Sequence, residues 1–204
     1  MTHLIVDTSS DLCLIALAKG HQILSQEIIP HANLLSKILL PAIQSLLQKH
    51  SLAPSDLSSI AVGIGPGSYT GTRLGVAVGK SLAFGLQIPL KAFNSLLCFI
   101  PPKDGNFVHI MPARSGAFFL LTGKLVNTTL YQEAAGLIPA EELLARAEHA
   151  DFVICLSPEN LPELWKQKPL FRPIPNLDAL CTYLSTLEPT PTEEVELLYL
   201  HIPG

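Results

Sequence analysis

Glycine is concentrated in one short stretch of this chain. Seven of the 13 glycines fall between Gly63 and Gly85, and the stretch begins with Gly-Ile-Gly-Pro-Gly-Ser-Tyr-Thr-Gly. A short apolar run from Ile60 to Gly63 precedes the turn residues, and an apolar pattern with helical spacing follows them from about Thr70 to Leu86. We therefore expect a strand, a tight turn and a helix in this region.

The turn between that strand and that helix has the geometry of an anion site. A helix start capped by Ser68 or Thr70 offers backbone N–H groups to a phosphate. The sequence matches neither common nucleotide motif, because the first glycines do not give G-x-G-x-x-G and Gly75 to Ser81 is one residue short of the P-loop spacing. Anion binding at Gly67 and Ser68 and a tight turn without a ligand are both open.

Three glycines of the stretch lie on one face of the predicted helix. Gly71, Gly75 and Gly79 recur at every fourth residue. Each costs about 1 kcal/mol of helix propensity relative to alanine, so the close approach of another backbone must offset the cost. The helix alone favours the sheet of its own domain as that neighbour, and a helix of a second chain is the alternative.

The preceding helix, predicted over Ala32 to Lys49, is apolar on more of its surface than one core requires. Its apolar side chains cover about 240° of the helical wheel, whereas contact with one core needs about 100°. Pro41 predicts a kink in this helix. We expect one face on the sheet and the other on a partner, in a bundle with the glycine-striped helix; a helix enclosed within one domain is the alternative. The predicted interface residues are Leu35, Leu39, Ile43, Leu46, Gly71, Gly75 and Gly79.

Composition supports the expectation of a partner. Apolar residues make up 48% of the 204 residues, charged residues only 15%, and the mean hydropathy is +0.37. So little charge covers a monomer's surface poorly. No apolar run is long enough to span a membrane. The net charge of −4 and the lack of a basic cluster argue against tight nucleic-acid binding by this chain alone.

The cysteines and the N-terminus predict a cytoplasmic protein. Four cysteines are scattered without a C-x-x-C spacing, which is typical of buried free thiols in a reducing compartment. The first residues lack the basic start and the apolar stretch of a secretory signal.

The order of the predicted elements repeats in two halves. The first half has strands at Leu4 to Asp7, Leu12 to Ala18 and Gln22 to Ile29, then the first helix, the short strand and the glycine-striped helix. A weaker second copy is predicted at Phe107 to Met111, Ala117 to Thr122, Thr128 to Ala134, Pro139 to His149 (helix), Phe152 to Leu156 and Leu161 to Lys168 (helix), with one more helix at Leu177 to Leu187. Two βββαβα halves predict an α/β fold of the ribonuclease-H-like, actin-like (ASKHA) class with a reduced second half, divided into residues 1–100 and 101–204; other mixed α/β domains are the alternative.

Few residues have a pattern that supports catalysis. Leu35 stands where an H-x-x-x-H pair with His31 would need its second ligand, and no serine has a G-x-S-x-G context.

Asp7 ends the first strand, where an actin-class fold often has a carboxylate facing metal or phosphate. Pro112 stands where the second half would hold its counterpart, which argues against paired-acid chemistry. Asp7 can instead bind backbone amides of its own turn. We therefore predict no metal, cofactor or catalytic residue, with Asp7, Gly67 and Ser68 as weak candidates for cofactor binding.

The sequence resembles the TsaB (YeaZ) family over residues 3 to 97. The resemblance is carried by Ile5 to Ser10, Cys13 to Leu17, His31, the leucine-rich helix through Leu40-Pro41, Ala61 to Gly75, Lys80 to Ala83 and Ile88 to Leu90. It thins to Ala113-Arg114 and the Leu198-Tyr199-Leu200 tail in the second half. Ile64 stands where the family commonly has Arg, and Pro112 where it commonly has Asp; these departures weaken the case for a nucleotide site.

This resemblance implies an actin-like fold and a role in making N6-threonylcarbamoyladenosine (t6A) in tRNAs that read codons beginning with adenine. It implies a non-catalytic partner and activator of TsaD, the related protein that carries the metal and the transfer chemistry, with the ATPase TsaE joining the pair. The two helices of the first half would form the bundle with TsaD, or with a second copy of this chain when TsaD is absent, and tRNA would be reached only through the complex.

Two other functions are compatible with parts of the sequence. The first is a metal-independent, actin-class nucleotide-binding protein or kinase, which Asp7 and the glycine-rich turn would serve. The second is a peptidase, which older family labels resembling "glycoprotease" suggest and which Leu35 argues against.

Overall fold

Two compact units make up the structure, which is a computed structural model. It describes residues 1–30, 34–101, 103–113, 116–156, 161, 170–171 and 175–198. The first unit comprises Met1–Ser95 together with the described part of Leu184–Tyr199, and the second comprises the described part of Leu96–Tyr183. The sequence predicted one boundary, at residue 100. The structure has its boundary after Ser95, and the chain returns to the first unit at Leu184, which was not predicted from the sequence.

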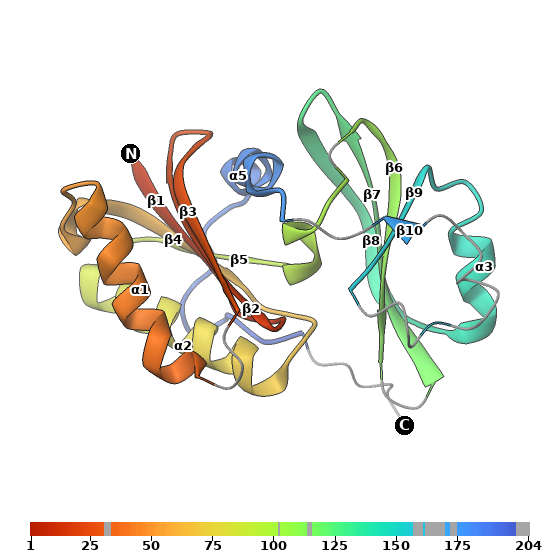
Figure 1. The fold of residues 1–204 in the computed structure, drawn as a ribbon, viewed down its shortest axis with the longest axis horizontal. Coiled ribbons are helices and arrows are strands. Elements are labelled where there is room, and N and C mark those ends of the chain that lie inside the picture. Colours follow the sequence, from red (N-terminus) through yellow and green to blue (C-terminus); the bar gives the residue numbers. More distant parts are fainter. Residues whose placement is uncertain are drawn as a thin grey trace. The chain divides into compact units, whose positions relative to one another are not determined.

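Sheet A of the first unit has five strands in the order β3-β2-β1-β4-β5 (Figure 1). Strands β1, β2 and β3, all three predicted from the sequence, form an antiparallel meander, and β4 and β5 run parallel to β1. The strands are β1 (Thr2–Asp7), β2 (Leu12–Lys19), β3 (Gln22–Pro30), β4 (Leu57–Gly63) and β5 (Leu90–Phe93). The sequence prediction omitted β5, a four-residue strand whose pairing with β4 depends on tertiary contact.

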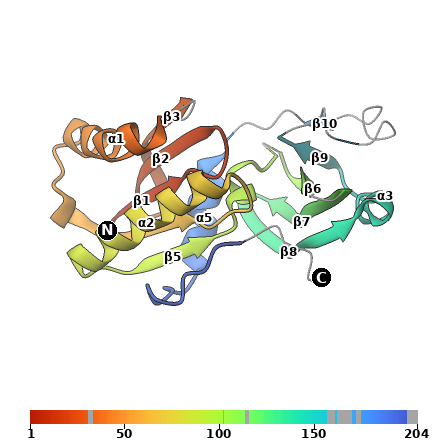
Figure 2. The same ribbon diagram turned by 90° about the horizontal axis from the view of Figure 1, so that it is seen from below.

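Helices α1 (Leu35–Lys49) and α2 (Tyr69–Leu86) cover one face of sheet A (Figures 1 and 2). Both lie where the sequence predicted helices, and α1 is continuous across Pro41, which is exposed. A 3₁₀ turn, Pro54–Asp56, connects α1 to β4. Gln87 adopts a left-handed conformation and ends α2.

The core of the first unit lies between these helices and the sheet. Leu39 and Leu46 on α1 are 1% and 0% exposed, and they pack with Val6, Ile15 and Val62 of the strands. Burying one leucine side chain stabilises a fold by about 1.5–3 kcal/mol, so α1 is held mainly by this face.

The second unit repeats the strand order of the first. Its sheet B has the order β10-β9-β6-β7-β8, in which β6 takes the central place that β1 has in sheet A. Strands β6, β7 and β8 are antiparallel, and β9 and β10 are parallel to β6. The strands are β6 (Gly105–Pro112), β7 (Ala117–Val126), β8 (Thr129–Pro139), β9 (Phe152–Cys155) and β10 (Leu170–Phe171). The predicted duplicated α/β fold with a reduced second half is confirmed.

The reduction is clearest in the helices of the second unit. The prediction of one helix from Pro139 to His149 is wrong, because β8 continues to Pro139 by pairing along the whole of β7. A 3₁₀ turn, Ala140–Glu142, and the four-residue α3 (Leu143–Arg146) follow. Only Leu143 of α3 and the adjacent Ala147 are buried there, so the sheet face supports a single turn. The predicted helix from Leu161 to Lys168 lies outside the described residues apart from Leu161.

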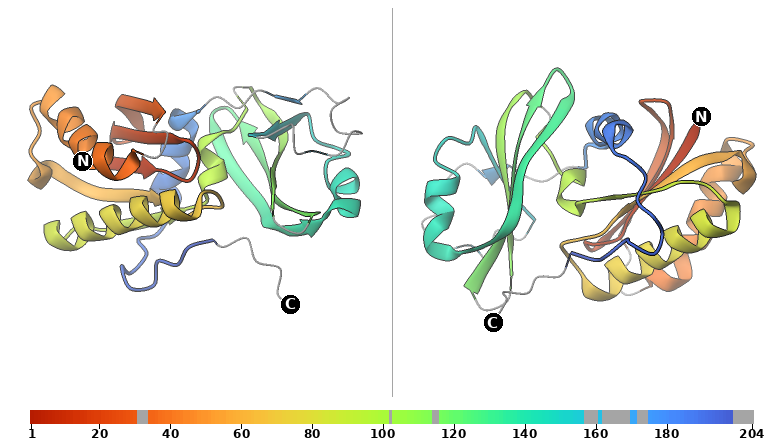
Figure 3. Two further views of the ribbon diagram at one scale, coloured as in Figure 1. Left: turned by 60° about the horizontal axis from the view of Figure 1, so that its bottom comes forward. Right: turned by 180° about the vertical axis from the view of Figure 1, so that it is seen from behind.

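Two connections complete the described chain. A 3₁₀ turn, Ser95–Cys98, leads into the second unit, and α5 (Leu177–Thr186) precedes the final described segment (Figure 3). Among the described residues, no helix is both long and apolar enough to cross a membrane.

Candidate functional site

Asp7 ends β1 as a fully enclosed carboxyl group. The side chain is 1% exposed, and its Oδ1 accepts hydrogen bonds from Ser9 N at 3.1 Å and from Ser9 Oγ at 2.9 Å. Burial raises the pKa of Asp7, and hydrogen bonds from Ser95 and Ser9 oppose the rise. Asp7 therefore binds its own turn, as the alternative interpretation of the sequence predicted.

The turn after β1 also covers the start of α2. Ser68 caps the helix, because its Oγ accepts a hydrogen bond from Gly71 N at 3.2 Å. Ser68 N donates to the carbonyl oxygen of Ser9 at 2.6 Å, and a Cβ added at Gly67 would lie 2.1 Å from that oxygen. The Ser68 N–H is thus already bound to a backbone carbonyl oxygen and is not available to an anion. Gly67 and Ser68 serve the close packing of two turns.

The glycine stripe of α2 packs inside the first unit. A Cβ at Gly71 would lie 2.2 Å from Thr8 O, one at Gly75 2.1 Å from Thr8 Oγ1, and one at Gly79 2.1 Å from Val62 Cγ1. Thr8 Oγ1 also donates to Gly71 O at 2.8 Å. The close neighbours of the stripe are therefore within the first unit, the turn after β1 for Gly71 and Gly75 and strand β4 for Gly79, in line with the internal packing that the helix pattern alone favoured.

The four interface residues predicted on α1 also point inward. Leu35, Leu39, Ile43 and Leu46 are between 0% and 5% exposed and belong to the core of the first unit. Their burial within the chain accounts for one of the two apolar faces of α1. The second face is carried by other residues, and the partner interface itself stays a prediction.

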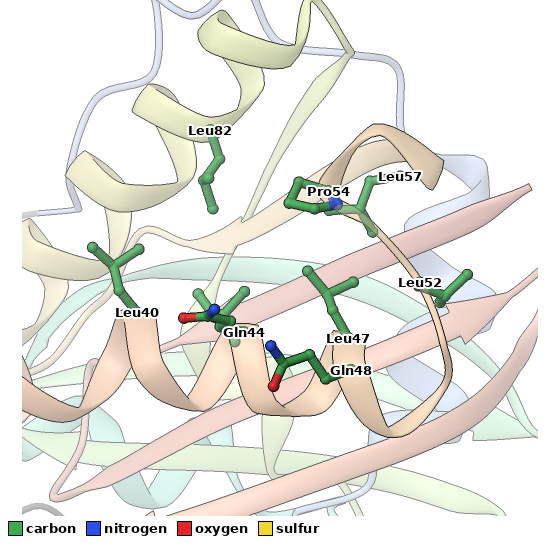
Figure 4. A pocket seen from close by; sticks show the side chains of 9 residues that line it. Leu40, Gln44, Leu47, Gln48, Leu52, Pro54, Leu57 and Leu82 are labelled. Atoms are coloured by element: carbon green, nitrogen blue, oxygen red, sulfur yellow. The ribbon is translucent and has the colours of Figure 1, made fainter.

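An apolar pocket of about 360 Å³ opens between α1, α2 and the segment that connects α1 to β4 (Figure 4). In Figure 4 the side chain of Leu82 extends from α2 toward α1, and Leu40 and Gln44 extend from α1 toward α2. The lining residues are Leu40, Ile43, Gln44, Leu47, Gln48, Leu52, Pro54, Leu57 and Leu82. Ile43 is the one predicted interface residue that lines it.

Large apolar side chains are exposed on both helices. Leu34, the N-cap of α1, and Leu40 within α1 are 52% and 53% exposed, and Phe84 of α2 is 72% exposed. Tyr69, also exposed, lies under the guanidinium of Arg73, which is 4.0 Å from the ring centre. We use the name α1–α2 surface for the pocket with its lining residues Leu40 and Leu82 together with the exposed side chains of Leu34 and Phe84; Phe84, two residues after Leu82, faces a different side of α2 from the pocket.

Leu82 and Phe84 were not among the interface residues predicted from the sequence. The helical spacing of α2 does, however, indicate that Phe84 is exposed. With 3.6 residues per turn, Phe84 lies on the side of α2 opposite the stripe of Gly71, Gly75 and Gly79. Once that stripe faces the sheet, Phe84 must face outward.

Two further groups of residues were singled out in the sequence. His31, Arg114, Tyr199 and Leu200 lie outside the described residues. The four cysteines are buried and free, as predicted, and no group of three or more metal-ligating side chains occurs among the residues that the structure describes.

The chain is similar to proteins of threonylcarbamoyladenosine biosynthesis. Residues 21–139 match the family model "TsaD: tRNA N6-adenosine threonylcarbamoyltransferase". The tRNA threonylcarbamoyladenosine biosynthesis protein TsaB of Bacillus subtilis is 36% identical over 168 residues, which cover 81% of this chain and 70% of that protein. The TsaB protein of Escherichia coli is 30% identical over 98 residues, 48% of this chain and 42% of that protein.

Solved structures agree over nearly the whole chain. YeaZ from Pseudomonas aeruginosa superposes with a TM-score of 0.76 at 25% identity, covering 98% of this chain and 99% of that chain. A second structure, described as an uncharacterized protein with similarity to peptidase YEAZ from the same organism, has a TM-score of 0.79 at 26% identity with the same coverage.

Proposed function

Because the chain belongs to the TsaB family, we propose that it is a component of t6A biosynthesis that acts as the non-catalytic partner and activator of TsaD. The product is the t6A of tRNAs that read codons beginning with adenine. The observation that carries this proposal is the α1–α2 surface, which comprises a pocket of about 360 Å³ and exposed leucine and phenylalanine side chains on the two helices.

The chemistry of this surface suits a protein partner. Covering a large apolar side chain that water now surrounds stabilises an assembly by about 1.5–3 kcal/mol, and Phe84 and Leu40 are largely uncovered. The pocket accepts an apolar anchor from the partner, while Gln44 and Gln48 at its wall supply hydrogen-bond donors and acceptors. Neither helix contains an acidic residue, so the surface is neutral to basic.

The buried residues predicted for the interface have an indirect role in this proposal. Leu35, Leu39 and Leu46 fix α1 on the sheet, and the glycine stripe fixes α2, so the exposed side chains are held in place before the partner arrives. A surface organised in advance loses less conformational entropy on binding.

The residues of the first unit support a role without chemistry of its own. Asp7 is enclosed, and the Ser9 carbonyl covers the start of α2. We further propose that TsaE joins the pair, that a second copy of this chain occupies the same surface in the absence of TsaD, and that tRNA is held only through the complex.

The test is copurification with TsaD followed by a tRNA modification assay with and without this chain. We expect Leu40→Glu and Phe84→Glu to weaken TsaD binding at least tenfold and to lower t6A formation. Tyr131→Glu, at a side chain on β8 that is 55% exposed, is the matched control and is expected to retain both. The proposal is wrong if TsaD modifies tRNA equally well without the chain, or if both glutamate variants bind TsaD normally.

A further inference from the structure

The described chain ends in a segment that lies across the first unit. Residues 187–198 follow α5 and form no helix or strand, yet they belong to the unit built by residues 1–95 (Figures 2 and 3, blue). We call residues 187–198 the C-terminal strap.

The centre of the strap is anchored beside α2. Val195 is 6% exposed and joins the same core as Val76 and Ala83 of α2, and Leu197 packs against that core. Lys80, also on α2, donates from Nζ to the carbonyl oxygen of Val195 at 3.2 Å. Two apolar side chains and the hydrogen bond from Lys80 therefore hold the strap beside the helix that carries Phe84.

The two ends of the strap are fixed by backbone hydrogen bonds. Thr190 N donates to Leu90 O of β5 at 2.7 Å, and Leu198 N donates to Ile64 O at 2.8 Å. The carbonyl oxygen of Leu198 lies so close to Gly65 that a Cβ there would be 3.1 Å away. The strap thus covers the turn that leads from β4 into α2.

This attachment is weak enough to open without unfolding the sheet. Val195 is the only fully buried side chain in residues 187–198, and Pro189 and Pro191 precede it. Four glutamates, all exposed, lie along the strap at positions 188, 193, 194 and 196, and α2 contains no acidic residue. Segments with few buried apolar contacts open at free energies well below that of global unfolding.

We propose that the C-terminal strap is a releasable latch whose closed position holds α2 and the Gly65 turn in the conformation that binds the partner. The inference rests on the proposed function and names a regulation of the same α1–α2 surface. With the strap open, α2 loses the Val195 side chain and the Lys80 hydrogen bond on one flank. The outward side chains of α2 then have more conformational freedom, and binding a partner must remove that freedom at a cost in entropy.

Coupling of this kind is reciprocal. If the closed strap strengthens TsaD binding by some factor, bound TsaD must favour strap closure by the same factor. Hydrogen exchange at the amides of Thr190 and Leu198 reports strap opening on the chain alone. The amide of Ile60, which donates to Pro89 O at 2.9 Å within the sheet edge, reports opening of the sheet.

The experiment measures TsaD affinity and hydrogen exchange for the full chain and three variants. Val195→Asp removes the anchor, and Lys80→Met removes the hydrogen bond while keeping an apolar stem. Glu193→Gln, at an exposed position of the strap, is the matched control. We expect about tenfold weaker binding for Val195→Asp, a smaller loss for Lys80→Met, and a change under twofold for Glu193→Gln. Saturating TsaD is expected to slow exchange at Thr190 and Leu198 together.

The outcomes separate this inference from the proposed function. If the unmodified chain does not bind TsaD, the proposed function fails and the coupling fails with it. If the chain binds TsaD but Val195→Asp and Lys80→Met bind within twofold of it, only the latch is overturned. Exchange of Thr190 and Leu198 only at the rate of Ile60 would also overturn it, because the strap would then open only with the sheet. If Val195→Asp does not fold, the TsaD affinity of Lys80→Met alone tests the latch.

Discussion

Gly79 of α2 lies directly against Val62 of β4, and a Cβ added to the glycine would come 2.1 Å from Val62 Cγ1. A β-branched side chain has little freedom to move away, so the helix is seated on the strand at a distance that only glycine permits. The position of α2, and with it that of Phe84, depends on this contact.

Gly79→Ala is therefore expected to destabilise the fold by about 1–3 kcal/mol, because α2 must shift away from β4. Gly85→Ala is the matched control, since Gly85 lies in the same helix with nothing within 4 Å of an added Cβ. That variant should gain about 0.5–1 kcal/mol from helix propensity. Urea denaturation of both variants measures the difference; equal stabilities would contradict the assigned packing.

Asp7→Asn is expected to stabilise the protein at neutral pH. Burial raises the pKa of Asp7 above 3.8, so the folded state holds the proton more tightly than the unfolded state. The stability that Asp7 contributes is then complete below pH 3.8 and is lost as the pH rises through the folded pKa. Denaturant unfolding at several pH values measures the difference in free energy of unfolding between Asp7→Asn and the original protein. We expect this difference to become smaller as the pH falls toward 4. An advantage that is the same at every pH would mean that Asp7 does not titrate as inferred.

His109 is expected to make the fold sensitive to mild acid. Its ring is fully buried, Nδ1 lies 3.0 Å from Leu96 O, and burial lowers the pKa to about 4 from 6.5. As the pH falls, His109 is protonated in the unfolded chain near pH 6.5 but in the folded chain only near pH 4. The contribution of neutral His109 to the free energy of unfolding is therefore full above pH 6.5 and decreases by up to about 3 kcal/mol toward pH 4. Circular dichroism during urea unfolding measures the slope with pH, and His109→Phe should flatten it. A variant with the slope of the original protein would count against this assignment.

Cys13 is expected to be unreactive in the folded protein. The thiol is buried on β2, and burial raises its pKa to about 11, with Asp7 and Glu27 adding to the rise. Thiolate is the reactive form, so a disulfide reagent at pH 8 should label Cys13 only after unfolding. Mass spectrometry of protein labelled before and after urea treatment distinguishes the two cases. Rapid labelling of the folded chain would show that β2 is accessible.

The sequence predicted the first unit well because its patterns are local. Short continuous apolar runs define β1 and β2, and the Gly65-Pro66-Gly67 turn precedes the start of α2. Strand β5 and the extension of β8 to Pro139 were missed, since both depend on pairing with a strand distant in sequence. No short segment of the sequence shows which distant strand will pair with it.

The partner interface stays a prediction, and the residues assigned to it differ from those that are exposed. Periodicity identified α1 as a helix with more apolar surface than one core needs, and Leu40 of α1 is indeed an exposed apolar side chain. Periodicity could not determine which of two apolar faces turns inward. Leu39 and Leu40 are neighbours in sequence, and only the packing on the sheet makes one 1% and the other 53% exposed.

Pro41 has a consequence for the flexibility of this surface. Proline has no N–H, so within α1 the carbonyl oxygen of Lys37 receives no helical hydrogen bond from position 41. Pro41 is exposed and adjoins Leu40, which lines the pocket. The fixed φ angle and the missing N–H of Pro41 therefore restrict the backbone of α1 next to Leu40, so the segment that carries Leu40 has less conformational freedom to lose when a partner binds.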